Sequence, residues 1–514
     1  MSNRTKGIIV FMFLGTLIVL GIYFGTTWLD GIKRTKSSDS GGATHTVRWA
    51  GDGYAGYAFI KSTEMRKRLA RKGIVLDFND DGAAYADRLK KLNDSEYDFI
   101  VLPISSYMEH GYRYKYPGVI TGAISESQGA DAILAFSDFP FTKINDLNDS
   151  EIRIVLTPDS PSEDLVNLTI TNFDLDELQG RQDWMIEASG SEAVYRQAKA
   201  DQNDPAKGKH LYPMWEPDVS NAIANLGMKK IWGSDNFRNY IIDVFVFSRK
   251  YVNNREEEVR EIMRTYFEIV DYYMARNEEM FDELRSVTGA RRTVVPSFMD
   301  NIKWYTLQEN AHIMFGIQGV AGAGSFADEG LVKTIYAWND VNRLMKKDIE
   351  VDNPYAILNK TFIEALISAA VTPVGTKLES VRDFEALSKD QWEKLQESGT
   401  MRVENITFKS GIGRLDSEGE GTVDNVAQKL IHNYPDYRVL IAGHTGYGDA
   451  DANMKLSQER ADIVRQQLIA VYNIDEDRIL AKGFGAERLP KRKNGESERA
   501  YRLRMQRVEF ILLQ

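Results

Sequence analysis

Two hydrophobic periodicities alternate over the middle of the chain. Between residue 46 and about residue 370, short apolar runs of strand length are separated by stretches in which apolar residues recur at helical spacing. The first three apolar runs are residues 46–50, 74–78 and 97–103, and charged helical segments connect them. This strand–helix–strand–helix–strand order is typical of a mostly parallel sheet with helices on both faces, so the region is predicted to be α/β.

A second unit of the same kind follows the first. Apolar runs at residues 132–136 and 151–156 predict its strands, and residues 218–226 predict one of its helices. The run at residues 241–248 is interpreted as a strand that returns to the first unit, and a long helix is predicted at residues 255–275. The middle of the chain is therefore expected to contain two units that share a returning strand.

Candidate ligand-binding residues lie where the predicted strands end or the predicted helices begin, because ligands of such sheets bind beyond the carboxyl ends of strands. They are Tyr54, Tyr57, Ser105, Ser106, Ser160, Ser162, Trp215 and Glu216. Ser160 and Ser162 could present free backbone N–H groups to an anion, or they could only cap a helix. Trp215 could equally be a packing residue. No Arg or Lys closely follows these turns, which disfavours phosphate, and Glu216 is a hint for an amine.

This arrangement resembles the type II periplasmic solute-binding proteins, in particular the nitrate, sulfonate and taurine group. The resemblance rests on an early Gly-Tyr turn, a strand end before Ser105, the segment 157–162 and the sequence Trp-Glu-Pro at 215–217. It implies two lobes that close on a small ligand, with crossovers near Ala135 and Val244. Lobe 1 would comprise about residues 47–135 and 244–370, and lobe 2 about residues 136–243.

The N-terminal region contains an uncharged apolar stretch at residues 7–29. As a helix it would be about 34 Å long, enough to cross a bilayer. Tyr23 and Trp28 stand where interfacial aromatic residues are common. A transmembrane helix with a cytoplasmic tail (residues 1–6) and a periplasmic tether (residues 30–46) is therefore predicted, and a cleaved signal peptide is the alternative.

The C-terminal region, residues 402–514, shows a shorter alternation of strands and helices. Its four strands are predicted to begin at Ile406, Tyr437, Arg478 and Arg507, and the first three are separated by amphipathic helices. The predicted order is βαβαββ. Residues 371–401 are interpreted as a linker with a capping box at residues 388–391 and a short helix at residues 392–395.

A polar stripe marks the second helix of the C-terminal region. Asn453, Ser457 and Arg460 are spaced i, i+4 and i+7, so they lie on one face of a helix that follows a strand ending in Gly-His-Thr at residues 443–445. A polar stripe that ends in an arginine suits a small ligand bearing a carboxylate.

With the sequences Asn-x-x-Leu-Ser-x-x-Arg-Ala at residues 453–461 and Gly-Phe-Gly-x-Glu at residues 483–487, this region is identified as an OmpA-like peptidoglycan-binding domain. The resemblance implies that an Asp after the Gly-His-Thr and the Arg of the Arg-Ala pair clamp diaminopimelate. Gly446 stands where that Asp is expected. The candidate peptidoglycan-binding residues are Thr445, Asp449, Asp451, Asn453, Arg460 and Arg507. The alternative is a domain used for protein contacts or dimerisation.

Composition narrows the functional classes. The net charge is −11 and no long basic run occurs, so nucleic-acid binding is not expected. The chain has no cysteine, which excludes disulfides and thiolate metal sites, and its six histidines show no paired-ligand spacing. Neither a metal nor a cofactor is predicted. No nucleophile–base motif stands out, so the chain is not expected to be an enzyme.

These features together predict a single-pass inner-membrane protein of a Gram-negative envelope, with most of the chain in the periplasm. The two-lobed domain would bind a small solute or a partner, and the OmpA-like domain would tether the protein to peptidoglycan. The alternative is a stator-like or channel-associated subunit with a membrane-protein partner or a homodimeric partner. Proton-driven stators need a carboxylate within the span, and the acid nearest to residues 7–29 is Asp30, at the edge of the span.

Overall fold

The computed structural model describes residues 45–179, 181, 183–204, 208–318, 328–369, 384–409, 414–493 and 495–514. The predicted tail at residues 1–6, the predicted membrane span at residues 7–29 and nearly all of the tether lie outside these residues. Within the described ranges, no helix combines the length and the hydropathy needed to cross a bilayer.

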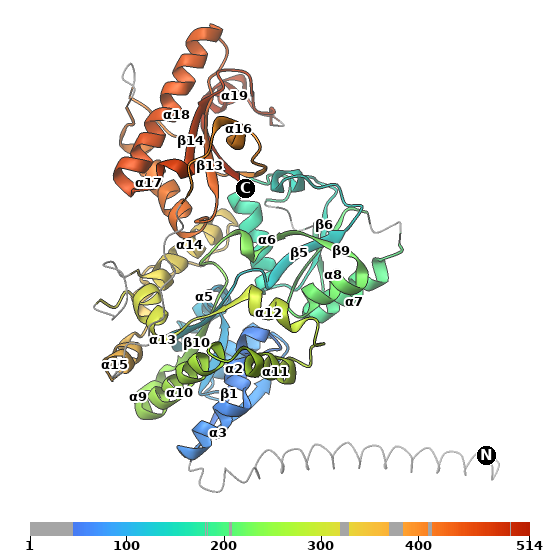
Figure 1. Cartoon of the computed structure of the whole chain (residues 1–514), viewed down its shortest axis with the longest axis vertical. Coiled ribbons are helices and arrows are strands. Elements are labelled where there is room, and N and C mark those ends of the chain that lie inside the picture. Colours follow the sequence, from blue (N-terminus) through green and yellow to red (C-terminus); the bar gives the residue numbers. More distant parts are fainter. Residues whose placement is uncertain are drawn as a thin grey trace, which may run out of the picture.

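Three sheets organise the described chain (Figure 1). The first has six strands in the order β11-β4-β10-β3-β1-β2. Its strands are β1 (His45–Gly51), β2 (Ile74–Asp80), β3 (Phe99–Pro103), β4 (Gly118–Ser127), β10 (Ile242–Ser248) and β11 (Ile302–Trp304). β1 runs parallel to β2 and β3, but β10 runs antiparallel to both β3 and β4. The sheet is therefore mixed, because the returning strand enters it in the opposite direction.

Helices surround this first sheet and complete lobe 1. They are α2 (Ala58–Lys61), α3 (Thr63–Arg71), α4 (Tyr85–Asn93), α5 (Ile104–Gly111), α9 (Arg249–Asn254), α10 (Glu256–Met274), α11 (Asn277–Thr288), α12 (Val295–Asn301), α13 (Leu307–Glu309), α14 (Gly330–Leu344) and α15 (Thr361–Ala369). Local sequence sets several of their starts. The Ser62 hydroxyl accepts from the Met65 N–H at the beginning of α3, and Ser248 does the same for Tyr251 at α9.

Lobe 2 is built on a second sheet of five strands, in the order β7-β6-β8-β5-β9. The strands are β5 (Asp131–Phe136), β6 (Arg153–Leu156), β7 (Met185–Glu187), β8 (His210–Trp215) and β9 (Met228–Gly233), and the helices are α6 (Pro161–Asn172), α7 (Ser191–Asp201) and α8 (Asp218–Leu226). β6 runs parallel to β7 and β8, whereas β5 is antiparallel to its two neighbours. The α/β class predicted for the middle of the chain is confirmed.

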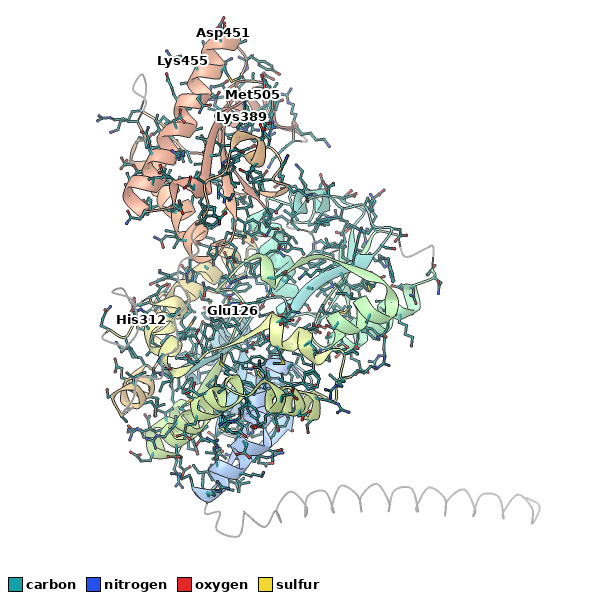
Figure 2. The ribbon with its side chains drawn as sticks, viewed as in Figure 1. Glu126, His312, Lys389, Asp451, Lys455 and Met505 are labelled. Atoms are coloured by element: carbon teal, nitrogen blue, oxygen red, sulfur yellow. The ribbon has the colours of Figure 1, made fainter. Side chains whose placement is uncertain are left out.

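Two short segments join the lobes, residues 128–130 between β4 and β5 and residues 234–241 between β9 and β10. The positions suggested by the sequence, Ala135 and Val244, instead lie inside β5 and β10. Each apolar run is a complete strand, so the crossover falls in the more polar segment before it. Glu126 (Figure 2), near the end of β4, accepts hydrogen bonds from the Asn239 backbone N–H of the second crossover and from the Tyr305 hydroxyl of lobe 1.

The C-terminal domain has a four-stranded sheet in the order β12-β15-β13-β14. Its elements are α16 (Lys389–Trp392), β12 (Glu397–Met401), α17 (Ser417–His432), β13 (Arg438–Gly443), α18 (Ala450–Tyr472), β14 (Ile479–Gly483), α19 (Glu498–Met505) and β15 (Val508–Leu513).

Two features of the C-terminal domain correct the predicted βαβαββ order. The first strand is β12, inside the predicted linker, while the predicted strand at residues 406–408 forms only an isolated bridge from Phe408 to Leu415. An additional helix, α19, precedes the last strand, so the order is βαβαβαβ. Charged residues at half of its positions hide α19 in the sequence, and Ser497 caps it by accepting from the Ala500 N–H.

The C-terminal domain packs directly on lobe 2. The amide of Asn172, at the end of α6, donates to the Tyr434 hydroxyl at 2.9 Å, and the Asn172 carbonyl accepts from the Arg402 N–H at 2.6 Å. Gly399 of β12 lies against Ile144 and Phe173 of lobe 2, where a side chain would collide. The buried apolar core continues through both lobes and into this domain.

The second crossover also contacts the C-terminal domain. The backbone N–H of Arg238 donates to the Asn433 carbonyl at 2.8 Å, and the Asn433 side chain donates back to the Arg238 carbonyl at 3.0 Å. The Tyr437 hydroxyl donates to Asn236 at 2.8 Å. The segment after α17 is therefore fastened to the chain segment that joins the two lobes.

Candidate functional site

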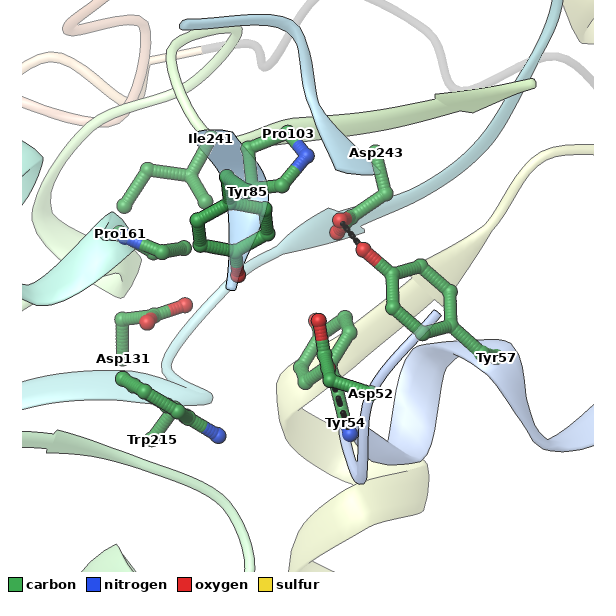
Figure 3. A pocket seen from close by; sticks show the side chains of 10 residues that line it. All are labelled: Asp52, Tyr54, Tyr57, Tyr85, Pro103, Asp131, Pro161, Trp215, Ile241 and Asp243. Atoms are coloured by element: carbon green, nitrogen blue, oxygen red, sulfur yellow. Dashed lines mark hydrogen bonds between the residues drawn. The ribbon is translucent and has the colours of Figure 1, made fainter. Parts of the chain in front are cut away.

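A small cavity lies between the lobes, at the strand ends where the two sheets face each other (Figure 3). Its volume is about 10 Å³, which is room for about one water molecule. Acidic and aromatic residues dominate its wall. The lining residues are Asp52, Tyr54, Tyr57, Tyr85, Pro103, Asp131, Pro161, Trp215, Ile241 and Asp243.

Strand direction explains why two of the acids face each other across the lobes. Asp131 is the first residue of β5, directly after the first crossover, and Asp243 is the second residue of β10, directly after the other. Because β5 and β10 run antiparallel to β8 and β3, their first residues pair with the last residues of those strands, Trp215 and Pro103. The acids thus lie at the carboxyl ends of the parallel strands, where open α/β sheets bind ligands.

Asp52, which follows β1, belongs to a buried ion network. The Arg88 guanidinium is fully buried and donates to Asp52 Oδ2 at 3.1 Å, to the Val101 carbonyl at 2.5 Å and to Asp81 Oδ2 at 2.7 Å. The Lys61 ammonium donates to the backbone carbonyl of Asp52. Arg88 is thus neutralised by Asp52 and Asp81, so its positive charge is not free for a ligand.

Among the described residues, no cation pairs with Asp131 or Asp243. Both are 2% exposed. The Tyr57 hydroxyl donates to Asp243 Oδ1, whereas Asp131 Oδ1 is buried without a hydrogen-bond partner among the described residues. Burial raises the pKa of Asp131 to about 7 and the pKa of Asp243 well above its usual range. Nearby Asp52 adds to both shifts, because like charges disfavour ionisation.

A larger groove of about 590 Å³ leads towards the cavity and shares Tyr85 with it. Its wall comes from residues 81–87 of lobe 1 and residues 157–159 and 187–190 of lobe 2. These segments follow β2, β6 and β7. Four acids line the groove, namely Asp81, Asp87, Asp159 and Glu187, and no described Lys, Arg or His lines either the groove or the cavity. The approach to the cavity is therefore negatively charged.

The structure brings three of the eight predicted solute-binding residues into the cavity wall: Tyr54, Tyr57 and Trp215. Tyr54 and Tyr57 meet edge to face, with ring centroids 5.3 Å apart. Glu216 does not line the cavity, because its carboxylate accepts hydrogen bonds from the Ser220 N–H and hydroxyl in the first turn of α8. The residue beside it in sequence, Trp215, faces the cavity instead.

The four predicted serines are buried outside the cavity wall. Ser105 donates to Asp164, so it joins α5 of lobe 1 to α6 of lobe 2. The Ser160 hydroxyl donates to the Thr157 carbonyl at 2.6 Å and does not cap α6. Ser106 and Ser162 are buried nearby, and the Ser162 hydroxyl has no hydrogen-bond partner among the described residues.

Sequence reasoning missed Asp52, Tyr85, Asp131 and Asp243. The sequence did carry a signal for Asp131 and Asp243, the two acids beside the crossovers. Each of them stands at the start of a mostly apolar strand. A carboxylate in such a run is costly to bury unless it has a partner or a function. The direction of the strands was the missing information. Both acids lie beside the cavity only because β5 and β10 run antiparallel to the neighbouring strands β8 and β3.

In the C-terminal domain, the glycines and the serine of the predicted motif hold helix and sheet together. An added side chain at Gly443 would lie 2.0 Å from the Ser457 carbonyl oxygen, and one at Gly483 would lie 2.5 Å from the Gln458 nitrogen. The Ser457 hydroxyl accepts from the Gly485 N–H at 2.9 Å. These residues let α18 approach β13 and β14 closely, so they build the site without forming its surface.

Arg460, in the polar stripe of α18, has no anionic partner in the part of the chain that the structure describes. Its guanidinium lies over the Phe408 ring, 5.1 Å from the ring centroid, and it makes no ion pair with any described residue. Burial lowers its pKa. The Asn453 amide donates to the Gly446 carbonyl at 3.0 Å and so fixes the turn after β13. Arg460 is therefore a half-buried cation whose donors have no hydrogen-bond partner among the described residues, and such a group suits a carboxylate.

Two of the other predicted residues have internal roles. Arg507 donates to Glu509 Oε1 at 2.6 Å and to the Arg488 carbonyl at 3.1 Å. Glu509 also lies 3.1 Å from the ring of buried His444. Burial opposes ionisation of Glu509, but His444 and Arg507 lower its pKa to about 2. Asp449 caps α18 by accepting from the Ala452 N–H at 2.9 Å.

The remaining positions lie around the same turn. Asp451 is exposed at the outer end of α18, far from both lobes (Figure 2). Thr445 is buried, and its N–H donates to the Gly485 carbonyl at 2.8 Å. A side chain added at Gly446 would meet only Met505, at 3.6 Å or more. The turn therefore has space for the Asp that the family resemblance implies there.

Similarity to known proteins agrees with this domain's geometry. Residues 407–502 match the OmpA family. The recognition made from the sequence is confirmed for this domain. The probable lipoprotein YiaD of Escherichia coli is 39% identical over 82 residues, which are 16% of this chain and 36% of that protein. The chain thus spans about a third of the length of this OmpA-related protein.

Solved structures with a similar fold include periplasmic binding proteins. The aliphatic sulphonate binding protein SsuA of Escherichia coli is 15% identical, with a TM-score of 0.43, and the match covers 68% of this chain and 98% of that chain. The desulfurization enzyme DszB is 12% identical, with a TM-score of 0.40, and covers 63% of this chain and 99% of that chain. Within the described residues, no group of three or more His or acidic side chains is arranged to hold a metal ion.

Proposed function

We propose that this chain is a cell-envelope protein that holds a small solute between its two lobes and associates with peptidoglycan through its OmpA-like domain. The solute half rests on one observation: a cavity at the strand ends is lined by side chains of both lobes. A molecule bound there would contact both lobes at once and would favour their closed arrangement.

The cavity volume of about 10 Å³ is far below the several hundred cubic ångströms typical of ligand sites. Solute entry therefore requires the lobes to separate about the two crossovers. The acidic groove beside the cavity, about 590 Å³, gives the entry route.

Thermal-shift measurements on the full chain test solute binding, with a panel of alkylamines, alkanesulfonates and sugars. Tyr57→Phe removes a hydroxyl that bonds Asp243 in the cavity. Tyr251→Phe is the matched control, because its hydroxyl donates to Glu258 outside the cavity. A compound whose stabilisation is reduced by Tyr57→Phe and unchanged by Tyr251→Phe binds at this site. If no compound of the panel stabilises the protein, the solute half of the proposal is refuted for these classes.

The peptidoglycan half rests on Arg460, a half-buried guanidinium on the face of α18 that has no anionic partner among the described residues. We propose that it binds a carboxylate of the peptide stem. Sedimentation of the full chain with purified peptidoglycan, with diaminopimelate as competitor, tests this. Arg460→Ala should abolish co-sedimentation, whereas Arg499→Ala, an exposed arginine of α19, should not. Equal binding by wild type and Arg460→Ala would exclude the proposed contact.

Anchoring in the inner membrane through residues 7–29, with the bulk of the chain in the periplasm, completes the proposal. Carbonate extraction of membranes, compared between the full chain and a chain without residues 1–44, tests it. Nothing in the matched families favours the stator-like alternative. We expect no enzymatic activity, although an enzyme occurs among the proteins of similar fold.

A further inference from the structure

The structure points to the chemical class of the solute. We infer that the inter-lobe cavity takes a small organic cation, a primary amine or a quaternary ammonium group, held between Asp131 and Asp243 and enclosed by aromatic rings. This inference rests on the proposed solute binding and names the class of ligand.

The first argument is the missing counter-charge. Asp131 lies in the cavity wall, is 2% exposed and has an oxygen without a hydrogen-bond partner among the described residues. The buried cation of the neighbouring ion network, Arg88, already bonds Asp52 and Asp81. A buried carboxylate is costly unless it is paired or protonated. An ammonium group between the lobes would supply the charge that Asp131 and Asp243 lack.

The second argument is the aromatic lining. Tyr54, Tyr57 and Trp215 contribute to the cavity wall together with Tyr85. Cations are attracted to the faces of such rings, and aromatic cages recognise quaternary ammonium groups. Within the described chain, Arg88 lies 4.8 Å from the Tyr85 ring centroid, whereas the rings of Tyr54, Tyr57 and Trp215 have no cation over them. Three cavity rings are thus available to a ligand.

The third argument is the charge of the entry route. In the groove, Asp81 is paired with Arg88 and Asp87 with Lys91, but Asp159 and Glu187 make no ion pair with a described residue. A cleft lined by one sign of charge concentrates ligands of the opposite sign and repels the others. An alkanesulfonate or a phosphate would meet Asp159 and Glu187 on this route and would find no basic side chain among the described residues of the cavity wall.

Isothermal titration of the full chain with tetramethylammonium, propylamine, methanesulfonate and glucose, at equal ionic strength, tests the inference. We expect binding of at least one of the two cations. Asp131→Asn keeps the shape and removes the charge, so it should weaken cation binding by at least tenfold. Asp201→Asn is the matched control, because Asp201 is a buried acid of the same lobe that accepts from the Tyr212 hydroxyl away from the cavity.

The outcomes separate this inference from the proposed function. Binding of methanesulfonate or glucose that Tyr57→Phe weakens, without binding of either cation, would overturn the inference and leave solute binding intact. Cation binding that Asp131→Asn leaves unchanged would overturn it as well, because the cation would then sit elsewhere. Absence of binding for all four probes would count against both.

Discussion

The raised pKa of Asp131 predicts that an amide at this position stabilises the solute-free protein at neutral and alkaline pH. The usual pKa of an Asp carboxyl is 3.8, and burial raises that of Asp131 to about 7. In the folded protein the carboxyl therefore holds its proton more tightly than in the unfolded chain. Stability is unaffected below about pH 4, falls between about pH 4 and pH 7, and is lowest above pH 7.

The magnitude follows from the shift. About three pKa units at about 1.4 kcal/mol each correspond to about 4 kcal/mol of stability lost above pH 7. Asp131→Asn removes this loss but buries an amide N–H₂ group, which costs about 1–2 kcal/mol where it finds no acceptor. The variant should therefore be more stable than wild type by about 2 kcal/mol at pH 8, and the difference should vanish or reverse near pH 4.5.

The assay is urea unfolding followed by tryptophan fluorescence, for wild type, Asp131→Asn and the control Asp201→Asn, from pH 4.5 to pH 8.5. The charged and titratable groups around Asp131 are Glu216, Asp52, Asp243 and Tyr54, which are common to all three proteins. Their titration contributes about equally to each protein and therefore cancels when the unfolding free energies of variant and wild type are subtracted. A constant difference across this range, or a variant that is less stable at pH 8, would refute the reasoning, because Asp131 would then be well satisfied as an anion.

Three further predictions concern the C-terminal domain. Gly446→Asp should fold normally, because the space beside Gly446 is bounded only by Met505 at 3.6 Å or more, and it should strengthen co-sedimentation with peptidoglycan. Gly443→Ala should unfold this domain, measured by loss of protease resistance, because the new Cβ would lie 2.0 Å from a backbone oxygen. Asn172→Ala should lower the unfolding free energy by about 1–3 kcal/mol, measured by urea unfolding, because it leaves the buried Tyr434 hydroxyl without its donor.

Most elements of the fold followed from sequence pattern, and the failures have physical causes. The predicted strands that precede the cavity are present, because strongly apolar runs of strand length leave few alternatives. β12 was missed because its sequence, Glu-Ser-Gly-Thr-Met at residues 397–401, has little apolar character. It forms because β15 offers an edge and because Gly399 fits against lobe 2. Tertiary contacts, and not the local sequence, therefore determine that residues 397–401 form a strand.

The candidate site was only partly accessible from the sequence. Tyr54 and Tyr57 were found because a glycine-rich turn after the first strand is a local signal. Asp131 and Asp243 are 112 positions apart, and they meet only because both crossovers return the chain in the antiparallel sense. Ser105 was favoured as a ligand-binding residue because it follows a strand end, but it makes a contact between the lobes instead. Local motifs identify turns, whereas the chain topology determines which residues of the two lobes face each other.

Helix α6 connects the cavity to the OmpA-like domain. Its first residue, Pro161, lines the cavity, and its last, Asn172, bonds the Tyr434 hydroxyl and the Arg402 N–H. All twelve residues are buried, and a helix of this length spans about 18 Å. Asp164, one turn into α6, accepts from Ser105 of lobe 1. A movement of lobe 1 away from lobe 2 must break this contact at one end of a rigid element whose other end is bonded to the OmpA-like domain. The inter-lobe cavity and the OmpA-like domain therefore share a structural element, which a flexible tether between independent domains would not provide.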